Sequence, residues 1–453
     1  MPSGDLEGFF NYRFVKVISF KQFHIRGLIS ISIFDCVLMV QKNCATGSLP
    51  ASANTQCFFE NSINCEEINM PSRVFNEKEL DLLKEVLASG ELSALGGKMT
   101  PRFEAEFARA MDAKFAVAMN CAMSVLHTAV IVSGAGAGDE VICDPLFVFG
   151  AVATMYNNAV PVFVDIDPVT MNMNPDLIEE KITERTKAII VTHAWGLPAK
   201  MDRIVGIAHK HNLLVIEDCA HALFATYKGK YAGTWGDVGS FSFQMSKQMG
   251  LGDGGMAVTN DENIAKALDL NAGAPTFASV AYGLHWNYRM TEQTSAIGLA
   301  QLEKSRGYIK ELVDIASLYD KAVKDCPWIV LQKDEDATHT YHFWAATFRG
   351  EKHGISMEEF TKALKEEKCS LFIGYTGIPA YKHPIIAQRM GYGRGCPLDC
   401  PHYDGTGSQY PDNLCPVAED IFHRMLLVYT FSDKEFHLHN AELLHKTIQK
   451  LSH

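Results

Sequence analysis

A single lysine separates two β-rich runs in the stretch "GSFSFQMSKQMGLGDGGMAVTND", which spans residues 239–261. This residue is Lys247, and several glycines follow it. Another apolar run, "VIED", ends in Asp218, and "CAHA" then supplies His221. A carboxylate after a buried strand is costly unless it meets a cation. The order of residues therefore predicts a site in which Asp218 and Lys247 act together. The alternatives are that Asp218 caps a helix and that Lys247 is a solvated loop charge.

Polar residues also end two further apolar runs. "VTHAWG" places His193 and Trp195 after one run, and "AMNCAMSVLH" places Asn120 and Ser124 where a helix is expected to begin. Small residues and free backbone amides at a helix N-terminus bind phosphate well. An ordinary helix cap is the alternative for the second stretch.

One ligand, pyridoxal phosphate, would use all of these residues together. It needs a lysine for a Schiff base, an anion site at a helix N-terminus, and a carboxylate that keeps its ring nitrogen protonated. An aromatic side chain against the ring face is also usual, and "DPLFVFGA" supplies Phe147 and Phe149. Pyridoxal phosphate would thus fit this set of residues, and the family resemblance given below adds to that expectation.

Elements that could position these residues follow a regular alternation from Met70 onward. Amphipathic helical patterns alternate with short apolar runs, which are "FAVAM", "DEVICD", "VPVFVDI", "KAIIVTH", "LLVIED", "VGSFSF" and "GMAVTN". Buried runs that alternate with helices predict an α/β fold with a mostly parallel sheet between helices. In such sheets, ligands bind where the strands end and the helices begin.

The domain organisation follows from changes in this pattern. We expect an N-terminal extension at residues 1–69, a large domain at 70–310 and a smaller α+β C-terminal domain at 311–453. Residues 391–413, rich in Gly, Pro, Asp and Tyr, predict a long loop. The extension is either without a role in function, a targeting segment or an accessory element.

Composition excludes several classes of protein. The chain has 453 residues and a net charge of −12 without a long basic run, so we expect no nucleic-acid partner. The apolar stretch at residues 27–40 contains Asp35 and is too short to span a bilayer, so we expect no membrane partner. Twelve cysteines follow no repeating framework in a chain of this length. They favour reduced thiols and a cytoplasmic location.

The order of motifs resembles that of a known family. "GDEVI", "VPVFVDID", "ITERTKAIIVTHAWGLPAKMD", "VIEDCAHAL", "YKGKYAGTWGDVGSFSF", the lysine, "GDGGMAVTND" and "NYRMTEQTSAIGLAQL" resemble the DegT/StrS family. Its members are fold type I, pyridoxal-phosphate-dependent aminotransferases that act on keto-sugars and cyclitols. The resemblance runs from about Met70 to the C-terminus. It implies an aspartate-aminotransferase-like large domain with a seven-stranded sheet.

The resemblance also implies a role for each matching residue. Lys247 matches the Schiff-base lysine, Asp218 the partner of the pyridine nitrogen, and His221 a residue near the ring hydroxyl. Phe149 matches the stacking aromatic, with Phe147 as the alternative because "VICDPLF" is one residue longer than usual. The implied phosphate contacts are Ala122, Met123, Ser124, Ser242 and, from the neighbouring subunit, Asn287.

One of these positions departs from the family pattern. Ala122 and Met123 occupy the place of a Gly-Thr or Ala-Thr pair, so a threonine hydroxyl for the phosphate is missing. Ser124 could supply a hydroxyl in its place. A hydrogen bond to a charged group contributes about 1.5–3 kcal/mol, so cofactor affinity could differ while the assignment stands.

Other candidates concern the substrate and a metal. We expect the substrate site to include Trp195, Tyr288, Tyr375 and His383, with surface packing as the alternative for the loop of Tyr375 and His383. A group of cysteines and a histidine could suggest a metal, but their spacing is not a standard zinc signature. We therefore expect no metal at this group, which consists of Cys396, Cys400, His402 and Cys415.

The sequence thus predicts a homodimeric aminotransferase that moves nitrogen from glutamate or glutamine to a keto-sugar or related cyclic ketone. Its active sites would be shared between subunits through Asn287, unless Asn287 merely caps the following helix. A dehydratase of the same family would carry histidine in place of Lys247, and a non-catalytic regulatory homologue would lack Lys247 or Asp218. The glycines of "SGAGAGDE" precede a strand and open no helix, so they are a weak match to a dinucleotide-binding motif.

Overall fold

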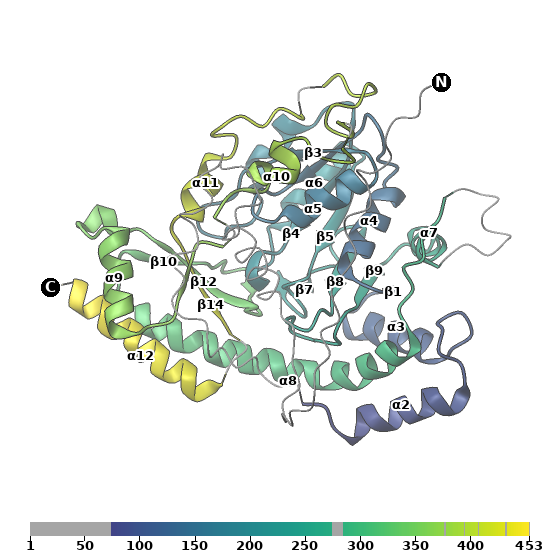
Figure 1. Cartoon of the computed structure of the whole chain (residues 1–453), viewed down its shortest axis with the longest axis horizontal. Coiled ribbons are helices and arrows are strands. Elements are labelled where there is room, and N and C mark those ends of the chain that lie inside the picture. The colour runs from purple at the N-terminus through teal and green to yellow at the C-terminus, as the bar shows by residue number, and fades with distance from the viewer. Residues whose placement is uncertain are drawn as a thin grey trace, which may run out of the picture. The chain divides into compact units, whose positions relative to one another are not determined.

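The computed structural model describes residues 74–273, 284–375, 377–393, 395–405, 407–430 and 433–452. The predicted extension at residues 1–69 lies outside these ranges. Two sheets dominate the described part, and one long helix, α8 (Glu292–Val323), runs from the elements around the larger sheet to those around the smaller one (Figure 1). The predicted domain boundary at residue 310 falls within α8.

The larger sheet has seven strands, and its order places the polar strand ends next to one another. In spatial order the strands are β1 (Phe115–Met119), β9 (Gly255–Thr259), β8 (Val238–Ser242), β5 (Leu214–Asp218), β4 (Thr186–Thr192), β2 (Glu140–Cys143) and β3 (Val160–Phe163). Only β9 runs antiparallel to its neighbours in this sheet. The predicted fold class is confirmed, and each of the seven predicted runs forms one of these strands.

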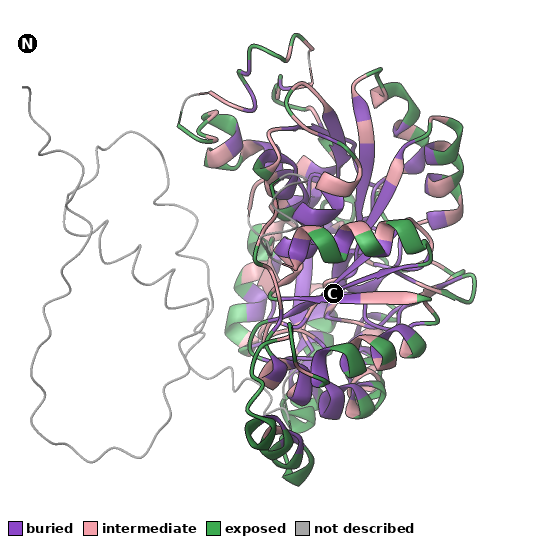
Figure 2. Ribbon diagram, turned by 90° about the vertical axis from the view of Figure 1, so that its right-hand side faces the viewer, coloured by how far each residue is buried: buried purple, intermediate pink, exposed green. Residues whose placement is uncertain are grey.

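Both faces of the large sheet are buried. Along β4, Ala188 and Ile190 pack into one hydrophobic core while Ile189 and Val191 pack into another. Alternation of this kind requires helices on both sides of the sheet. The helices around the sheet are α2 (Glu77–Ser89), α3 (Met99–Ala110), α4 (Ala122–Val132), α5 (Val148–Tyr156), α6 (Met201–Lys210) and α7 (Glu262–Ala272). Figure 2 shows buried strands between helices whose outer faces are exposed.

The smaller sheet has four strands, in the order β10 (Ile329–Leu331), β12 (Phe343–Phe348), β14 (Met425–Tyr429) and β13 (Phe372–Ile373). Its core is shared with the C-terminal half of α8 and with α9 (Met357–Glu367) and α12 (Lys434–Leu451). A three-stranded sheet joins β11 (Ala337–Thr338) to β6 (Thr226–Tyr227) and β7 (Lys230–Tyr231). Along the chain, β11 lies between β10 and β12 of the smaller sheet, and β6 and β7 lie between β5 and β8 of the larger one, so this third sheet connects the two parts.

The long loop predicted at residues 391–413 has no helix or strand in its described residues. It lies between α10 (Pro384–Ala387) and α11 (Pro416–Phe422) and is fastened to the large-sheet part by tyrosine hydroxyls. The pairs are Tyr392 with the Tyr156 carbonyl at 2.8 Å, Tyr403 with Glu140 Oε1 at 2.6 Å, and Tyr410 with the Pro161 carbonyl at 2.8 Å. The last of these bonds occupies a backbone carbonyl of the edge strand β3. No helix among the described residues is long and apolar enough to cross a membrane.

Candidate active site

Lys247 lies at the tip of a loop that leaves β8 and returns as β9. Backbone hydrogen bonds close the base of this loop, from Phe243 N–H to the Gly254 carbonyl and from Leu251 N–H to the Phe243 carbonyl, both at 2.8 Å. Lys247 itself is half-buried. Burial lowers the pKa of its amine to about 8, and the negative charge of Asp218 opposes that shift. Such a pKa leaves a usable fraction of neutral amine near pH 7.5.

Asp218 ends β5 and is 4% exposed. Its Oδ1 accepts a hydrogen bond at 3.0 Å from Ala220 N–H, in a turn with no helix after it. The helix-cap alternative is therefore wrong. Burial raises the pKa of the carboxyl, while the hydrogen bond from Ala220 N–H and the charge of Lys247 lower it. Asp218 and Lys247 are thus near enough for each charge to influence the pKa of the other, and their joint role in a site stays a prediction.

His221 lies in a cluster of stacked and edge-on rings. Its imidazole stacks on Trp195, with centroids 5.6 Å apart, and on His342, with centroids 4.3 Å apart. The edge of Phe147 completes the cluster, 5.4 Å from His221 and 5.0 Å from Trp195. Burial lowers the pKa of His221 well below its usual value, and the charge of Lys247 adds to that effect. The neutral imidazole is thus the stable form at this position.

The start of α4 forms a backbone cradle near the end of β8. Cys121, its N-cap residue, makes no side-chain capping bond, so no side chain of the described residues caps the first amides of the helix. Gly255 packs directly on this turn, because a Cβ atom there would lie 2.6 Å from the Ala122 nitrogen. Ser242 pairs with Gly255 across the β8–β9 ladder. The geometry therefore brings together Ala122, the next residues of α4, and Ser242.

The hydroxyl of Ser124 is already engaged in this structure. It donates to Asn120 Oδ1 at 2.6 Å and lies 3.2 Å from Cys121 Sγ. Met123 offers only its backbone amide, as the sequence indicated. A phosphate at this helix start would thus depend on backbone amides and the helix dipole more than on hydroxyls.

The other predicted residues fall in different places. Tyr375 joins the ring cluster, 4.7 Å from Trp195 and 5.6 Å from Phe147. Phe149 lies on the first turn of α5 and is 48% exposed, so the structure brings Phe147 and not Phe149 into the cluster. An exposed ring can still stack on a ligand, so the role of Phe149 stays a prediction.

Tyr288 and Asn287 lie near the start of α4. Tyr288 accepts at its carbonyl from Asn120 N–H at 2.7 Å, and its hydroxyl lies 3.0 Å from His127 Nδ1. It lines a cavity of about 450 Å³ whose other walls are Cys121, Met123, Ser124, His127, Tyr156, Trp286 and Tyr392. Asn287 is exposed. Thr291, not Asn287, caps α8, so the alternative that Asn287 caps this helix is wrong.

His383 is exposed and caps the short helix α10, with Nδ1 accepting from Ile385 N–H at 3.4 Å. The structure gives it no contact with the ring cluster among the described residues. Its neighbour Tyr381 is buried and bonds Glu419 and Cys415 N–H, which is a packing role. A substrate role for His383 stays a prediction.

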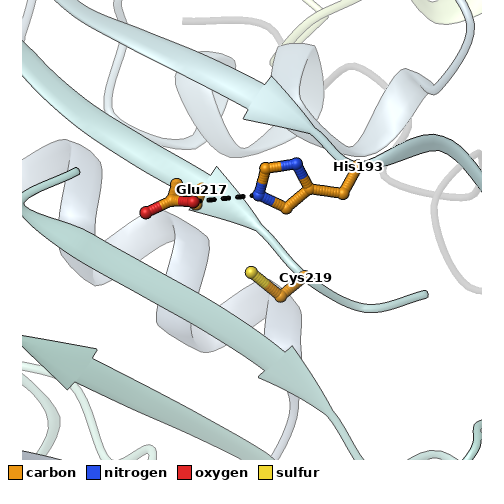
Figure 3. Close-up of side chains that lie close together, drawn as sticks. All are labelled: His193, Glu217 and Cys219. Atoms are coloured by element: carbon orange, nitrogen blue, oxygen red, sulfur yellow. Dashed lines mark hydrogen bonds and ion pairs between the residues drawn. The ribbon is translucent and has the colours of Figure 1, made fainter. Parts of the chain in front are cut away.

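A buried polar group supports the strand that carries Asp218 (Figure 3). His193 Nδ1 accepts from Ala199 N–H at 3.1 Å, so Nε2 carries the proton and donates to Glu217 Oε2 at 3.0 Å. Glu217 also accepts from Gly233 and Gly236 N–H. Glu217, His193 and Cys219 have the spacing of metal ligands, but a metal would have to displace these hydrogen bonds. We interpret the group as structural. The four residues Cys396, Cys400, His402 and Cys415 form no such group in the described chain.

The family model for the DegT/DnrJ/EryC1/StrS aminotransferase family matches residues 74–402. The chain belongs to this family. The resemblance stated from the motifs and the class of enzyme, an aminotransferase, are both confirmed.

Two relatives and one solved structure show the closeness of the match. A GDP-perosamine synthase of Escherichia coli O157:H7 is 34% identical, over 76% of this chain and 96% of its own. A protein of Streptoalloteichus tenebrarius with the provisional name L-glutamine:3-amino-2,3-dideoxy-scyllo-inosose aminotransferase is 39% identical, over 70% and 82%. The aminotransferase from Psychrobacter cryohalolentis has a similar structure, with a TM-score of 0.73, 27% identity and coverage of 84% and 98%.

Solved structures with this aminotransferase fold include pyridoxal phosphate and pyridoxamine phosphate forms. Three features of this chain fit such a cofactor. The amides at the start of α4 are uncapped, and Gly255, which has no side chain, lets the start of β9 pack directly against that turn. His221 Nδ1 and Trp195 Nε1 are buried without a hydrogen-bond partner among the described residues. A buried polar atom without a partner is rare and indicates a ligand or a water.

Three residues of the site were not found from the sequence. His342, just before β12, stacks on His221. Gln248 connects the Lys247 loop to Leu223 and Thr340. Asp144 accepts from Leu146 and Phe147 N–H. Burial raises the pKa of Asp144 to about 6. Its bonds set the turn that directs Phe147 into the cluster. The extra residue in "VICDPLF" was the available signal for this turn, whereas His342 and Gln248 carried none.

Proposed function

We propose that this aminotransferase holds pyridoxal phosphate on Lys247 and moves an amino group from glutamate or glutamine to a keto-sugar or related cyclic ketone. The observation that carries the proposal is a half-buried lysine with a pKa of about 8, placed where its charge and that of the buried Asp218 carboxylate influence each other. Perturbed groups of opposite charge in one site are typical of catalysis.

Each group of the site has a place in this proposal. The cofactor, when bound, supplies an electron sink that stabilises negative charge on the substrate carbon. The carboxylate of Asp218 would hold the proton on the ring nitrogen, and His221 Nδ1 would meet the ring hydroxyl. The amides of Ala122 to Ser124, with Ser242, would hold the phosphate. Asn287 of the neighbouring subunit would complete that contact.

Lys247 would have two roles. It would hold the resting cofactor covalently, and after release it would take the proton from the α-carbon of the substrate. General bases work best when their pKa lies near the working pH, and a pKa of about 8 meets that condition.

The acceptor class follows from the relatives. One relative is named for a GDP-sugar product and another for an amino-inosose acceptor with glutamine as donor. These names concern a sugar and a cyclitol ketone, so we propose an acceptor of one of these two kinds. We further propose a homodimer with shared sites in the cytoplasm, which agrees with free cysteines throughout the described chain.

Two measurements on purified protein test the proposal. Borohydride should fix the cofactor on the peptide that contains Lys247, and glutamate or glutamine should convert the absorbance of the bound cofactor from about 420 nm to about 330 nm. A panel of keto-sugars and keto-cyclitols should then yield an amine that mass spectrometry detects.

Lys247→Ala should abolish turnover while the far-UV circular dichroism spectrum is retained. The matched control is Lys310→Ala, which removes an exposed lysine of α8 and should leave activity unchanged. Near-normal turnover in Lys247→Ala, or borohydride labelling of a different lysine, would overturn the proposal.

A further inference from the structure

Gln248 follows Lys247 directly and is 2% exposed. Its Oε1 accepts from Leu223 N–H at 3.0 Å, and its Nε2 donates to the carbonyl and the Oγ1 of Thr340, at 2.9 and 3.0 Å. The orientation of the amide is determined, because an N–H must face the oxygen and a carbonyl must face the NH₂ group. Both ends of the side chain are thus engaged.

The two partners of Gln248 belong to different parts of the molecule. Leu223 lies in the turn that carries His221, two residues earlier. Thr340 lies just before β12 of the smaller sheet, and its own N–H donates to the Gly196 carbonyl at 3.1 Å. Gln248 therefore connects the lysine loop to the His221 turn and to the small-sheet part at once.

The residue before Lys247 is held in a similar way. Tyr429, at the end of β14, donates its hydroxyl to the Ser246 carbonyl at 2.5 Å. Lys247 is consequently flanked on both sides by hydrogen bonds that reach the smaller sheet. A loop fixed at Ser246 and at Gln248, on either side of the lysine, cannot move out toward solvent without losing these bonds.

We propose that Gln248 is a positioning residue for Lys247, whose carboxamide fixes the lysine loop against the His221 turn and against Thr340. The proposal rests on the assignment of Lys247 as the cofactor lysine. Gln248 itself touches neither reacting atoms nor cofactor in this arrangement. It sets how deeply the lysine amine is buried and where that amine lies relative to His221.

A measurable consequence follows from the burial of the amine. Burial is the main cause of the low pKa of Lys247. If the loop loses its bonds to Leu223 and Thr340, the amine gains contact with water and its pKa rises toward 10.5. A rise from about 8 to about 9 would reduce the neutral fraction at pH 7.5 about eightfold.

The test uses Gln248→Met in the cofactor-free full chain. Methionine has a similar length and no hydrogen-bonding amide. The lysines are dimethylated with ¹³C-formaldehyde, and the Lys247 signal is assigned by its absence in Lys247→Ala. We expect the titration midpoint of this signal to rise by about one pH unit. In separate, unmethylated samples, the rate at which pyridoxal phosphate becomes fixable by borohydride at pH 7.5 should fall about eightfold.

The matched control is Gln301→Met. Gln301 is a buried glutamine of α8 whose Nε2 donates to the Val74 carbonyl and to Glu79 Oε1, on the α2 side of the molecule. Its loss should lower thermal stability and leave the Lys247 titration unchanged. A purely structural role for Gln248 would make the two variants behave alike.

Thr340→Val provides a second variant that keeps the shape of its residue and removes the Oγ1 that accepts from Gln248 at 3.0 Å and donates to the Gly196 carbonyl at 3.5 Å. It should shift the Lys247 titration in the same direction by a smaller amount. If Gln248→Met does not fold, this variant decides the question. An unchanged Lys247 titration in the folded variants would refute the positioning role. Labelling of another lysine by borohydride would refute the assignment of Lys247, and the titration would still report on Gln248.

Discussion

A lysine that is partly removed from water should make the cofactor-free protein less stable. The pKa of Lys247 is lowered from 10.5 to about 8 chiefly by burial, so the folded state disfavours its charged form. Replacing it with methionine keeps the length of the side chain and removes the charge. We therefore predict that Lys247→Met is inactive and more stable than the natural protein at pH 7, as expected where function and stability compete.

The magnitude and its pH dependence follow from linkage. Lowering the pKa of an amine from 10.5 to about 8 corresponds to about 3 kcal/mol of unfolding free energy. Below pH 8 the cost is present in full, because both states hold the proton and only the folded state buries it. Between pH 8 and 10.5 the unfolded chain binds more protons, so the natural protein gains stability as pH rises. Solvent still reaches part of Lys247, which reduces the expected gain to about 2 kcal/mol at pH 7.

Thermal unfolding of the cofactor-free proteins, followed by circular dichroism at pH 7 and pH 10, measures this difference. For a folded body of this size, 2 kcal/mol corresponds to a rise in Tm of about 3 °C at pH 7. The rise should shrink to about 1 °C or less at pH 10. Lys310→Met, at an exposed lysine of α8, should show no change at either pH. A lower Tm for Lys247→Met at pH 7, or a gain that persists at pH 10, would refute the reasoning.

Two further predictions concern catalysis. Asp218→Asn keeps an oxygen that accepts from Ala220 N–H but loses the negative charge. Turnover, measured as amine formed per site, should therefore fall by about 10²–10³-fold while the fold stays intact. An unchanged rate would mean that Asp218 has only a structural role. Mixing Lys247→Ala with Asn287→Ala subunits should restore activity, because one site of each mixed dimer carries neither lesion. With subunit exchange verified and Asn287→Ala severely impaired alone, no recovery on mixing would mean that each site belongs to one chain.

The strands of the large sheet could be predicted because their apolar runs are bounded by turns and each buries both faces. Asp218 and Lys247 were found for the same reason, since each stands beside such a run. The start of α2 is also set locally, by a capping box formed by Asn76 and Glu79. Local patterns of this kind need no knowledge of distant parts of the chain.

Contacts between distant segments explain what could not be predicted. His342 follows His221 by more than a hundred residues, and only the packing of the smaller sheet brings the two rings together. Phe147 could not be distinguished from Phe149 by sequence, because the turn set by Asp144 decides which ring faces inward. β12 begins only at Phe343 because Tyr341 adopts a left-handed conformation, with φ of 47°.

The close approach at Gly196 shows why the site needs both sheets. Trp195 adopts φ of 60° and Gly196 φ of 105°, and a Cβ atom at Gly196 would lie 2.8 Å from the His221 carbonyl and 2.9 Å from the Tyr341 nitrogen. Only glycine lets these three backbones meet. The carbonyls of Trp195 and Gly196 then accept from His342 and Thr340 N–H, which places the His342 ring on His221. The ring that would meet the cofactor hydroxyl is therefore oriented by the smaller sheet, so the large-sheet part alone should hold His221 less firmly than the whole chain does.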